Sequence, residues 1–116
     1  MGQPFIIDKK ISKNDLIKLT QQIFGDMIKL VVDIEKEKIA LDGELHADEE
    51  ALMLEQGSQQ KNLWGANIYP QATKGKQIEY TSLINIRPTD DNRSMTVENE
   101  KIKKKMETII NTWIEL

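Results

Sequence analysis

The sequence predicts a small α+β domain, with about three helices packed on an antiparallel or mixed sheet of about four to five strands. Three observations predict it. Apolar residues recur at helical spacing near both ends of the chain, β-branched runs occur between them, and turn residues separate the segments. A length of 116 residues is typical of one domain, so we expect residues 1–116 to form one.

The N-terminal segment predicts one strand and one helix. A short apolar run predicts the strand over residues 4–8. Ser12 and Asp15 have the spacing of a capping box, and Gly25 is the kind of residue that ends a helix. A helix is therefore expected over residues 13–24.

The next segment predicts a β-hairpin. Residues 27–34 are rich in β-branched side chains, and residues 39–41 form a second apolar run that ends at the turn-forming pair Asp42-Gly43. One continuous helix over residues 27–41 is an alternative that the pattern leaves open, because lysine, glutamate and alanine favour helix.

The middle of the chain predicts a short helix followed by a strand. Asp48 is a suitable N-cap for a helix over residues 49–55, and Gly57 is expected to end it. After Gly65, the apolar run at residues 66–69 predicts the strand.

The C-terminal part predicts another strand and the last helix. The strand is expected over residues 78–86, and residues 88–92 have the composition of a turn. One face of this strand contains Ile78, Tyr80, Ser82, Ile84 and Ile86. Asn99 is the expected N-cap of the helix, and residues 101–105 are expected to form its solvated, lysine-rich face. The apolar stripe of the helix contains Ile102, Met106, Ile109, Ile110 and Trp113.

The composition excludes several kinds of site and partner. Because there is no cysteine, thiol nucleophiles, thiolate metal sites and disulfides are excluded. The net charge of -3 gives no general attraction to nucleic acid, and no apolar run reaches the roughly 20 residues of a membrane span. The N-terminus lacks a secretory leader, so a cytoplasmic location is expected. No cofactor-binding motif occurs, and we expect no cofactor.

Three stretches together carry a resemblance to a known family. They are FGDMIKLVVDIEKE at residues 24–37, GELHADEEALMLEQGS at 43–58 with LWGANIYP at 63–70, and EYTSLINIRP at 79–88 followed by NRSM at 92–95. The chain resembles a family of small uncharacterised prokaryotic proteins that is described only as a domain of unknown function. The resemblance implies family membership over most of the chain, and it implies no reaction, cofactor or catalytic residue.

The strongest candidate for chemistry is the single histidine, His46. An imidazole beside Asp48 and Glu49 has the groups that general acid–base catalysis needs, and divalent metals accept the same nitrogen and oxygen ligands. The spacing matches no known metal motif, so metal binding stays an open question. The alternative is structural. In that case Asp48, Glu49 and Glu50 form an acidic first turn of a helix, and His46 makes a local hydrogen bond.

The segment around His46 is strongly acidic. Residues 33–55 contain nine acidic side chains and two lysines, which gives a local charge of -7 (nine negative charges against two positive ones). Such a segment attracts a cation or a basic partner. The alternative is a solvated face that binds nothing.

A second group of candidates surrounds the turn at residues 88–92. Arg87 and Arg93 are the only arginines, and arginine binds carboxylate or phosphate through two parallel hydrogen bonds. Asn85 and Asn92 are expected to orient such an anion. The alternative is that the arginines pair with acidic side chains of the same chain.

Trp64 and Asn67 are candidates for lining a pocket. Gly65 lies between them, and a glycine lets a ligand approach the backbone closely. The alternative is that both side chains belong to the core, since tryptophan is largely buried in small domains.

These residues support two functional hypotheses. The first is a binding or assembly domain, which forms a homo-oligomer or recognises a protein or a small acidic ligand. The second is a small enzyme in which His46, with Asp48 or Glu49, acts as acid–base or metal ligand, while Arg87 and Arg93 hold an anionic substrate. The second requires all these side chains to meet in one cleft. Neither hypothesis involves a membrane or nucleic acid.

Overall fold

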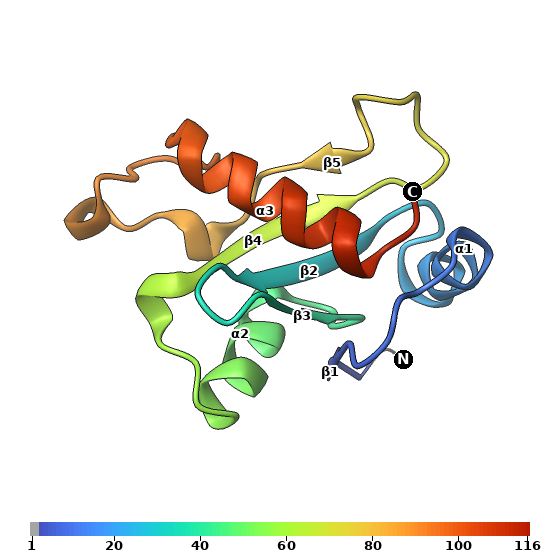
Figure 1. Cartoon of the computed structure of the whole chain (residues 1–116), viewed down its shortest axis with the longest axis horizontal. Helices are drawn as coiled ribbons and strands as arrows, with labels where there is room; N and C mark the ends of the chain where they lie inside the picture. The colour runs from blue at the N-terminus through green and yellow to red at the C-terminus, as the bar shows by residue number, and fades with distance from the viewer. Residues whose placement is uncertain (1–2) are drawn as a thin grey trace.

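The computed structural model describes residues 3–116 and contains one five-stranded antiparallel sheet (Figure 1). In chain order the elements are β1 (Phe5–Ile6), α1 (Lys13–Ile23), β2 (Ile28–Asp33), β3 (Lys38–Leu41), α2 (His46–Glu55), η1 (Gln60–Asn62), β4 (Leu63–Ile68), β5 (Ile78–Glu79), η2 (Leu83–Asn85), η3 (Pro88–Asp90) and α3 (Glu100–Trp113). The strands lie in the order β1-β3-β2-β4-β5. Figure 1 shows α3 across one face of the sheet and α2 on the opposite face, which confirms the α+β prediction.

The predicted hairpin forms, and the alternative helix over residues 27–41 is wrong. β2 pairs with β3, and Val31 lies opposite Ala40. Glu37 in the connecting turn has a φ of 56°, a left-handed conformation that a right-handed helix excludes. Because β2 is flanked by β3 and β4 and is largely buried, packing of its β-branched side chains outweighs the helix propensity of the neighbouring lysines and glutamates.

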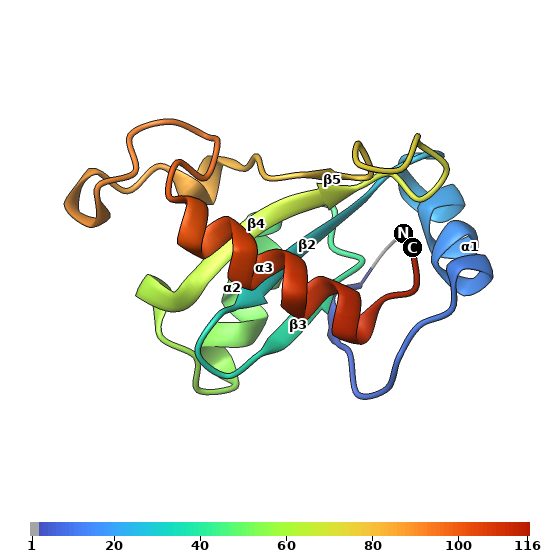
Figure 2. The same cartoon turned by 45° about the horizontal axis from the view of Figure 1, so that its top comes forward.

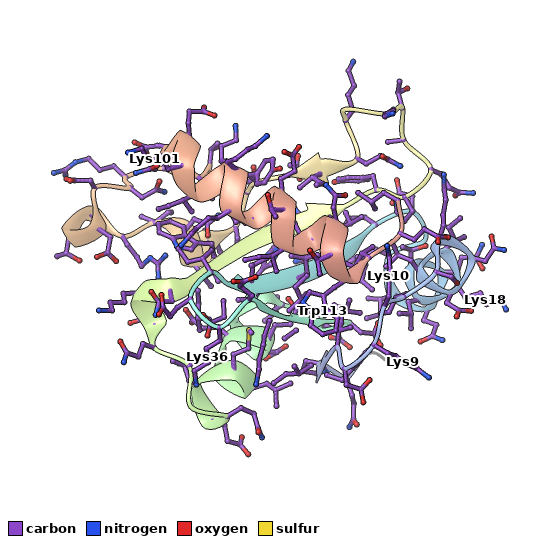
Figure 3. All side chains as sticks on the ribbon, viewed as in Figure 1. Lys9, Lys10, Lys18, Lys36, Lys101 and Trp113 are labelled. Atoms are coloured by element: carbon purple, nitrogen blue, oxygen red, sulfur yellow. The ribbon has the colours of Figure 1, made fainter. Side chains whose placement is uncertain are left out.

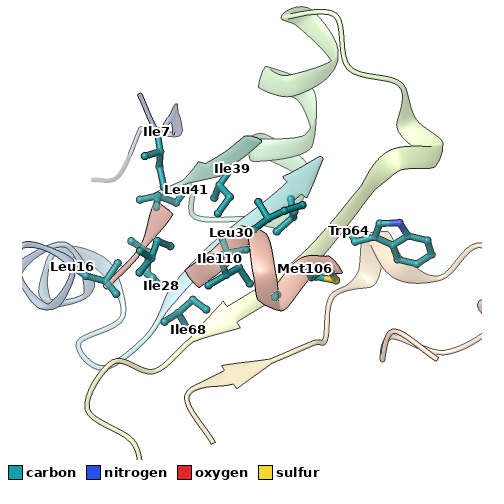
Figure 4. Close-up of a cluster of buried hydrophobic side chains, with 14 of the residues drawn as sticks. Ile7, Leu16, Ile28, Leu30, Ile39, Leu41, Trp64, Ile68, Met106 and Ile110 are labelled. Atoms are coloured by element: carbon teal, nitrogen blue, oxygen red, sulfur yellow. The ribbon is translucent and has the colours of Figure 1, made fainter. Parts of the chain in front are cut away.

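The face of the sheet under α3 carries the main hydrophobic core (Figure 4). Successive side chains of a strand point to opposite faces. Leu30 and Val32 of β2 therefore pack with Met106 and Ile110 of α3, whereas Val31 points to the other face. A typical buried aliphatic side chain stabilises a fold by about 1.5–3 kcal/mol, so this layer dominates the stability.

The opposite face carries a smaller apolar cluster. Val31, Ala40 and Leu63 of the sheet pack there against Met53 of α2, and Ile84 of η2 packs at the margin. This cluster covers only one part of the face. The remaining part is polar and carries the candidate functional site.

The first and last helices begin at the predicted caps. Ser12 Oγ accepts a hydrogen bond from the Asp15 N–H at 3.1 Å, and Asn99 Oδ1 accepts one from the Lys101 N–H at 2.8 Å. Beyond α3, Ile114 forms an isolated parallel bridge with Ile11, just before α1. Figure 2 shows the resulting approach of the C-terminal end of α3 to α1.

The second helix begins earlier than predicted, so Asp48 is not its N-cap. α2 starts at His46, and its N-cap residue Leu45 makes no capping hydrogen bond through its side chain. The Gly43 N–H instead donates to Glu49 Oε2 at 2.9 Å. This buried contact fixes the chain before the helix, and sequence spacing alone does not reveal it.

β4 also begins earlier than predicted. The sequence predicted a strand over residues 66–69, after Gly65, but β4 runs from Leu63 to Ile68 with every residue buried. Trp64 and Gly65 are therefore central strand residues, paired with β2 through Val32 and Val31.

The predicted strand over residues 78–86 is largely wrong. β5 contains only Ile78 and Glu79, and the chain then leaves the ladder. Ser82 Oγ accepts a hydrogen bond from the Ile84 N–H at 3.2 Å and begins η2, so the predicted common face does not form. The side chain of Asn85 takes the place of a strand at this edge of β4, as described below.

Candidate functional site

A row of three polar side chains crosses the α2 face of the sheet. Lys29 of β2 lies opposite Asn67 of β4, and Asn67 lies opposite Glu79 of β5. Asn67 Nδ2 donates to Glu79 Oε1 at 2.8 Å, while Asn67 Oδ1 is buried without a partner among residues 3–116. Asn67 is 8 % exposed, so it is the buried centre of a row whose two ends carry opposite charges. We call these three residues the polar row.

His46 lies beside the polar row. Its Nε2 is 2.8 Å from the carbonyl oxygen of Ala66, and a carbonyl only accepts, so Nε2 carries the proton of the neutral ring. Burial lowers the pKa of His46, and the hydrogen bond to the Ala66 carbonyl opposes this only in part. The lowered pKa favours the neutral form of the imidazole. The expectation of a purely local hydrogen bond is wrong, because Ala66 is 20 residues away along the chain.

Glu49 belongs to the same helix as His46 and is completely buried. Its Oε2 accepts the hydrogen bond from Gly43, and its Oε1 has no partner among the described residues. Burial raises the pKa of Glu49 well above its ordinary value. A Cβ on Gly43 would lie 2.9 Å from Glu49 Cγ, so a glycine is needed for this close approach.

Asp42 lies next to this contact in a strained conformation. Its φ is 73°, which is uncommon for a residue other than glycine, and its Oδ1 is buried without a partner in the described part of the chain. Burial also raises the pKa of Asp42. Asp33 is fully buried as well, and its carboxylate accepts the Ser58 hydroxyl at 2.7 Å. The alternative of a wholly solvated acidic face over residues 33–55 is therefore wrong for Asp33, Asp42 and Glu49.

We predict that Glu49→Gln removes a pH-dependent loss of stability. Because the pKa of Glu49 is raised in the folded state, the folded protein binds this proton more tightly than the unfolded chain does. The free energy of unfolding is therefore highest below the ordinary pKa of about 4.5 and falls as the pH rises above it. Glutamine keeps an acceptor for Gly43 and cannot ionise. Urea unfolding from about pH 5 to about pH 9 should give a stability difference, Glu49→Gln minus wild type, that becomes more favourable as the pH rises.

The matched control for this prediction is Glu55→Gln, an exposed change on the same helix. Taking the difference from wild type cancels the contribution of His46, which both proteins share. A difference for Glu49→Gln that does not change with pH would show that this carboxyl ionises alike in the folded and unfolded states.

His46 and Ser82 meet over Gly65. A Cβ on Gly65 would lie 2.8 Å from Ser82 Oγ and 3.1 Å from His46 Cδ2, so both side chains cover the same strand residue. Leu45 precedes His46 and Leu83 follows Ser82. These two leucines are 56 % and 72 % exposed, the largest values among the exposed large apolar side chains of residues 3–116.

Arg87 lies in different surroundings from His46. Its guanidinium carbon is 3.9 Å from the centre of the Trp64 ring, and its side chain donates to the carbonyl of Gln60 and pairs with Asp90 at 3.6 Å. Figure 4 shows Trp64 at one end of the core that faces α3. The charges acting on His46 come from Lys29 and Glu79, whereas those acting on Arg87 come from Asp90 and Glu50.

The remaining predicted residues have structural or exposed positions. Asn85 and Asn92 are buried and hydrogen-bonded to the backbone, and Asn92 Nδ2 donates to the Asn85 carbonyl at 2.8 Å. Asp48 and Arg93 are exposed. Arg87 pairs within the chain, as the alternative expected, but with Asp90 rather than with the acidic segment at residues 33–55.

The fold thus brings together His46, Glu49 and Asn67 of the predicted site residues. It adds Lys29 and Ser82, which sequence reasoning missed because each is placed by strand register or by η2 rather than by a motif. The roles of the predicted residues in binding or catalysis stay predictions.

Three cavities of the described chain lie elsewhere. One of about 690 Å³ lies between β5, the segment at residues 72–77 and α3, and two of about 360 Å³ lie beside α1 and α3. The predicted site residues line none of the three. Within residues 3–116, no group of three or more His, Asp or Glu side chains is arranged to hold a metal ion. No helix in this range has the length and apolarity needed to cross a bilayer.

The fold and the site define a class: an antiparallel α+β domain whose helix α2 carries a buried histidine and a buried glutamate. The chain belongs to the family described as "Protein of unknown function (DUF5674)", which matches residues 5–113. This confirms the resemblance to a domain of unknown function. No curated protein and no solved structure matches the chain.

Proposed function

We propose that this domain is an assembly module that binds a second copy of itself through the surface formed by α2 and η2. The observation that carries the proposal is the position of Leu45 and Leu83. These highly exposed apolar side chains are the chain neighbours of His46 and Ser82, which both lie over Gly65. Exposed apolar side chains gathered at one place are typical of protein interfaces.

The exposed apolar side chains of the described chain are concentrated in this region. Five of the seven large ones belong to α2, its N-cap or the segment at residues 83–95, namely Leu45, Leu54, Leu83, Ile86 and Met95. α2 and η2 are in contact, with Ile84 packed on the cluster that contains Met53. Burying such side chains between two copies gains about 25 cal/mol for each Å² of apolar surface.

The polar residues beside the leucines support recognition rather than chemistry. Protein interfaces combine apolar anchors with a few polar groups that fix orientation. Lys29 and Glu79 at the two ends of the polar row offer a donor and an acceptor to a facing copy. In a twofold dimer each of these groups meets the same surface of the partner.

The proposal predicts that Leu83→Asp abolishes self-association. The wild type is expected to show a dimer mass by size-exclusion chromatography with light scattering at high concentration, and to dissociate on dilution. Introducing a charge at an apolar anchor costs about 2 kcal/mol or more, so the dissociation constant should rise at least about thirtyfold. Leu83 is 72 % exposed, so the change should leave the stability of the monomer almost unaltered.

Phe5→Asp is the matched control. Phe5 is 39 % exposed and pairs with Leu41, whose side chain belongs to the α3 face, so Phe5 points away from the proposed surface. Its mutant should associate like the wild type. A wild type that stays monomeric at every concentration, or an equal effect of both changes, would overturn the proposal.

A further inference from the structure

A groove on the α3 side of the sheet has a composition unlike that of the rest of the chain. Its volume is about 360 Å³, and it lies between the turn of the β2–β3 hairpin and the outer side of α3. Ile34 and Glu37 line it from the hairpin, and lysines line it from the helix. Its volume is within the range of small-ligand sites, about 300–1,000 Å³. We call it the lysine groove.

The floor of the lysine groove is apolar. Ile109 is 4 % exposed and Ile34 is half-buried, and both belong to the main core or pack against it. The Thr108 hydroxyl donates to the Lys104 carbonyl at 3.0 Å, which satisfies its proton within the helix. The interior of the groove therefore suits an aliphatic group better than a strongly polar one.

The rim of the lysine groove is positively charged. Lys101 and Lys105 are one helical turn apart, so they lie on the same side of α3. Neither forms an ion pair within residues 3–116, whereas Lys104 pairs with Glu107 at 3.6 Å. Figure 3 shows Lys101 and Trp113 toward opposite ends of α3.

The lysines of the rim combine two kinds of contact. A lysine keeps its ammonium group in water while its methylene stem covers apolar surface. The whole chain has a net charge of -3, so a pair of uncompensated lysines over an apolar groove is a local feature and not a reflection of composition. Glu37 at the hairpin end disfavours a negative group there, so the geometry directs an anionic group toward Lys101 and Lys105.

We propose that the lysine groove binds a small organic anion with a short aliphatic tail, such as a medium-chain alkyl carboxylate. The tail lies on Ile34 and Ile109, and the carboxylate lies between the ammonium groups of Lys101 and Lys105. The site is on the opposite face of the sheet from the assembly surface, so the two proposals can fail independently.

The test is calorimetric titration of the full chain with octanoate, hexanoate and acetate. Octanoate is expected to bind at one site per chain, and each methylene lost from the tail should weaken binding up to about fourfold, the change that corresponds to 0.8 kcal/mol. Lys101→Gln/Lys105→Gln should weaken octanoate binding about tenfold. Thr108→Phe, at an exposed helix position, should block the groove while leaving the fold intact.

Lys61→Gln/Lys76→Gln is the matched control, because it removes two exposed lysines that line no part of the groove. It should bind octanoate like the wild type. Trp113 gives a second reading, because its Nε1 donates to the Glu37 carbonyl at the groove, so its fluorescence should change on binding. Equal binding of acetate and octanoate, equal binding by both double mutants, or no heat at any concentration would overturn the proposal.

Discussion

Replacing Asn85 with alanine is expected to destabilise the fold by about 3–5 kcal/mol. Asn85 Oδ1 accepts from the Gly65 N–H at 2.8 Å, and Asn85 Nδ2 donates to the carbonyls of Gly65 and Met95, each at 3.0 Å. The side chain is fully buried. Alanine leaves the N–H and the carbonyl of Gly65 without partners, whereas the Met95 carbonyl still accepts from the Ser82 N–H at 3.0 Å. Each unsatisfied buried group costs about 1–3 kcal/mol.

Urea unfolding at equilibrium measures this loss, with Asn111→Ala on the exposed side of α3 as the matched control. The control should lie within about 0.5 kcal/mol of wild type. Asn85→Asp is a useful second variant, because it keeps the acceptor for the Gly65 N–H and loses the donors. At a pH that keeps the new carboxylate ionised, the free energy of unfolding of Asn85→Asp should lie between those of wild type and Asn85→Ala if the accepted bond matters more than the donated ones. If the donated bonds matter more, Asn85→Asp should be no more stable than Asn85→Ala. A loss below about 1 kcal/mol for Asn85→Ala would show that water replaces the amide at this edge of β4.

The elements that could be predicted are those whose signals are local. Ser12 and Asn99 are caps whose partners lie within three residues, and the structure shows both hydrogen bonds. The hairpin could be predicted because the β-branched run at residues 27–34 fits a buried central strand. In each case the residues that determine the element are also the residues that form it.

The elements that were mispredicted depend on hydrogen bonds that the local sequence pattern does not reveal. Residues 78–86 do alternate as a strand does, yet Asn85 donates and accepts at Gly65, 20 residues away, and the chain leaves the sheet. Asp48 has the composition of an N-cap, yet the start of α2 is fixed by the contact between Gly43 and Glu49. In both segments a hydrogen bond between a side chain and the backbone outweighed the local preference.

The candidate site likewise contains residues that the local sequence reveals and residues that it does not. The unusual single histidine drew attention to His46, and the acidic segment drew attention to Glu49. Lys29 could not be found in this way, because its position opposite Asn67 follows only from the register of β2 and β4. His46 and Arg87 have different contacts, because His46 bonds to Ala66 whereas the guanidinium lies against Trp64 and Gln60.

Gly65→Ala is expected to destabilise the fold by about 2–3 kcal/mol and to disturb the candidate site at the same time. The new Cβ would lie 2.6 Å from Ser82 Cβ, a separation that real Cβ atoms essentially never show, and 3.1 Å from His46 Cδ2. Ser82 Cβ is held by the backbone where η2 begins and cannot rotate away. The strand must therefore move from η2, or η2 must move from the strand with Leu83.

A double-mutant cycle with Ser82→Gly separates this clash with Ser82 from any other cost of placing a side chain at position 65 of β4. Ser82→Gly alone loses the hydrogen bond to the Ile84 N–H and should cost about 1 kcal/mol. In the double mutant the Cβ of Ala at position 65 no longer meets Ser82, so we expect it to be more stable than the sum of the single changes by at least about 1 kcal/mol. If the two changes simply add, the loss in Gly65→Ala comes from elsewhere in the strand. If they couple as expected, and self-association falls in Gly65→Ala but returns in the double mutant, the proposed assembly requires the position of η2, which carries Leu83, relative to Gly65.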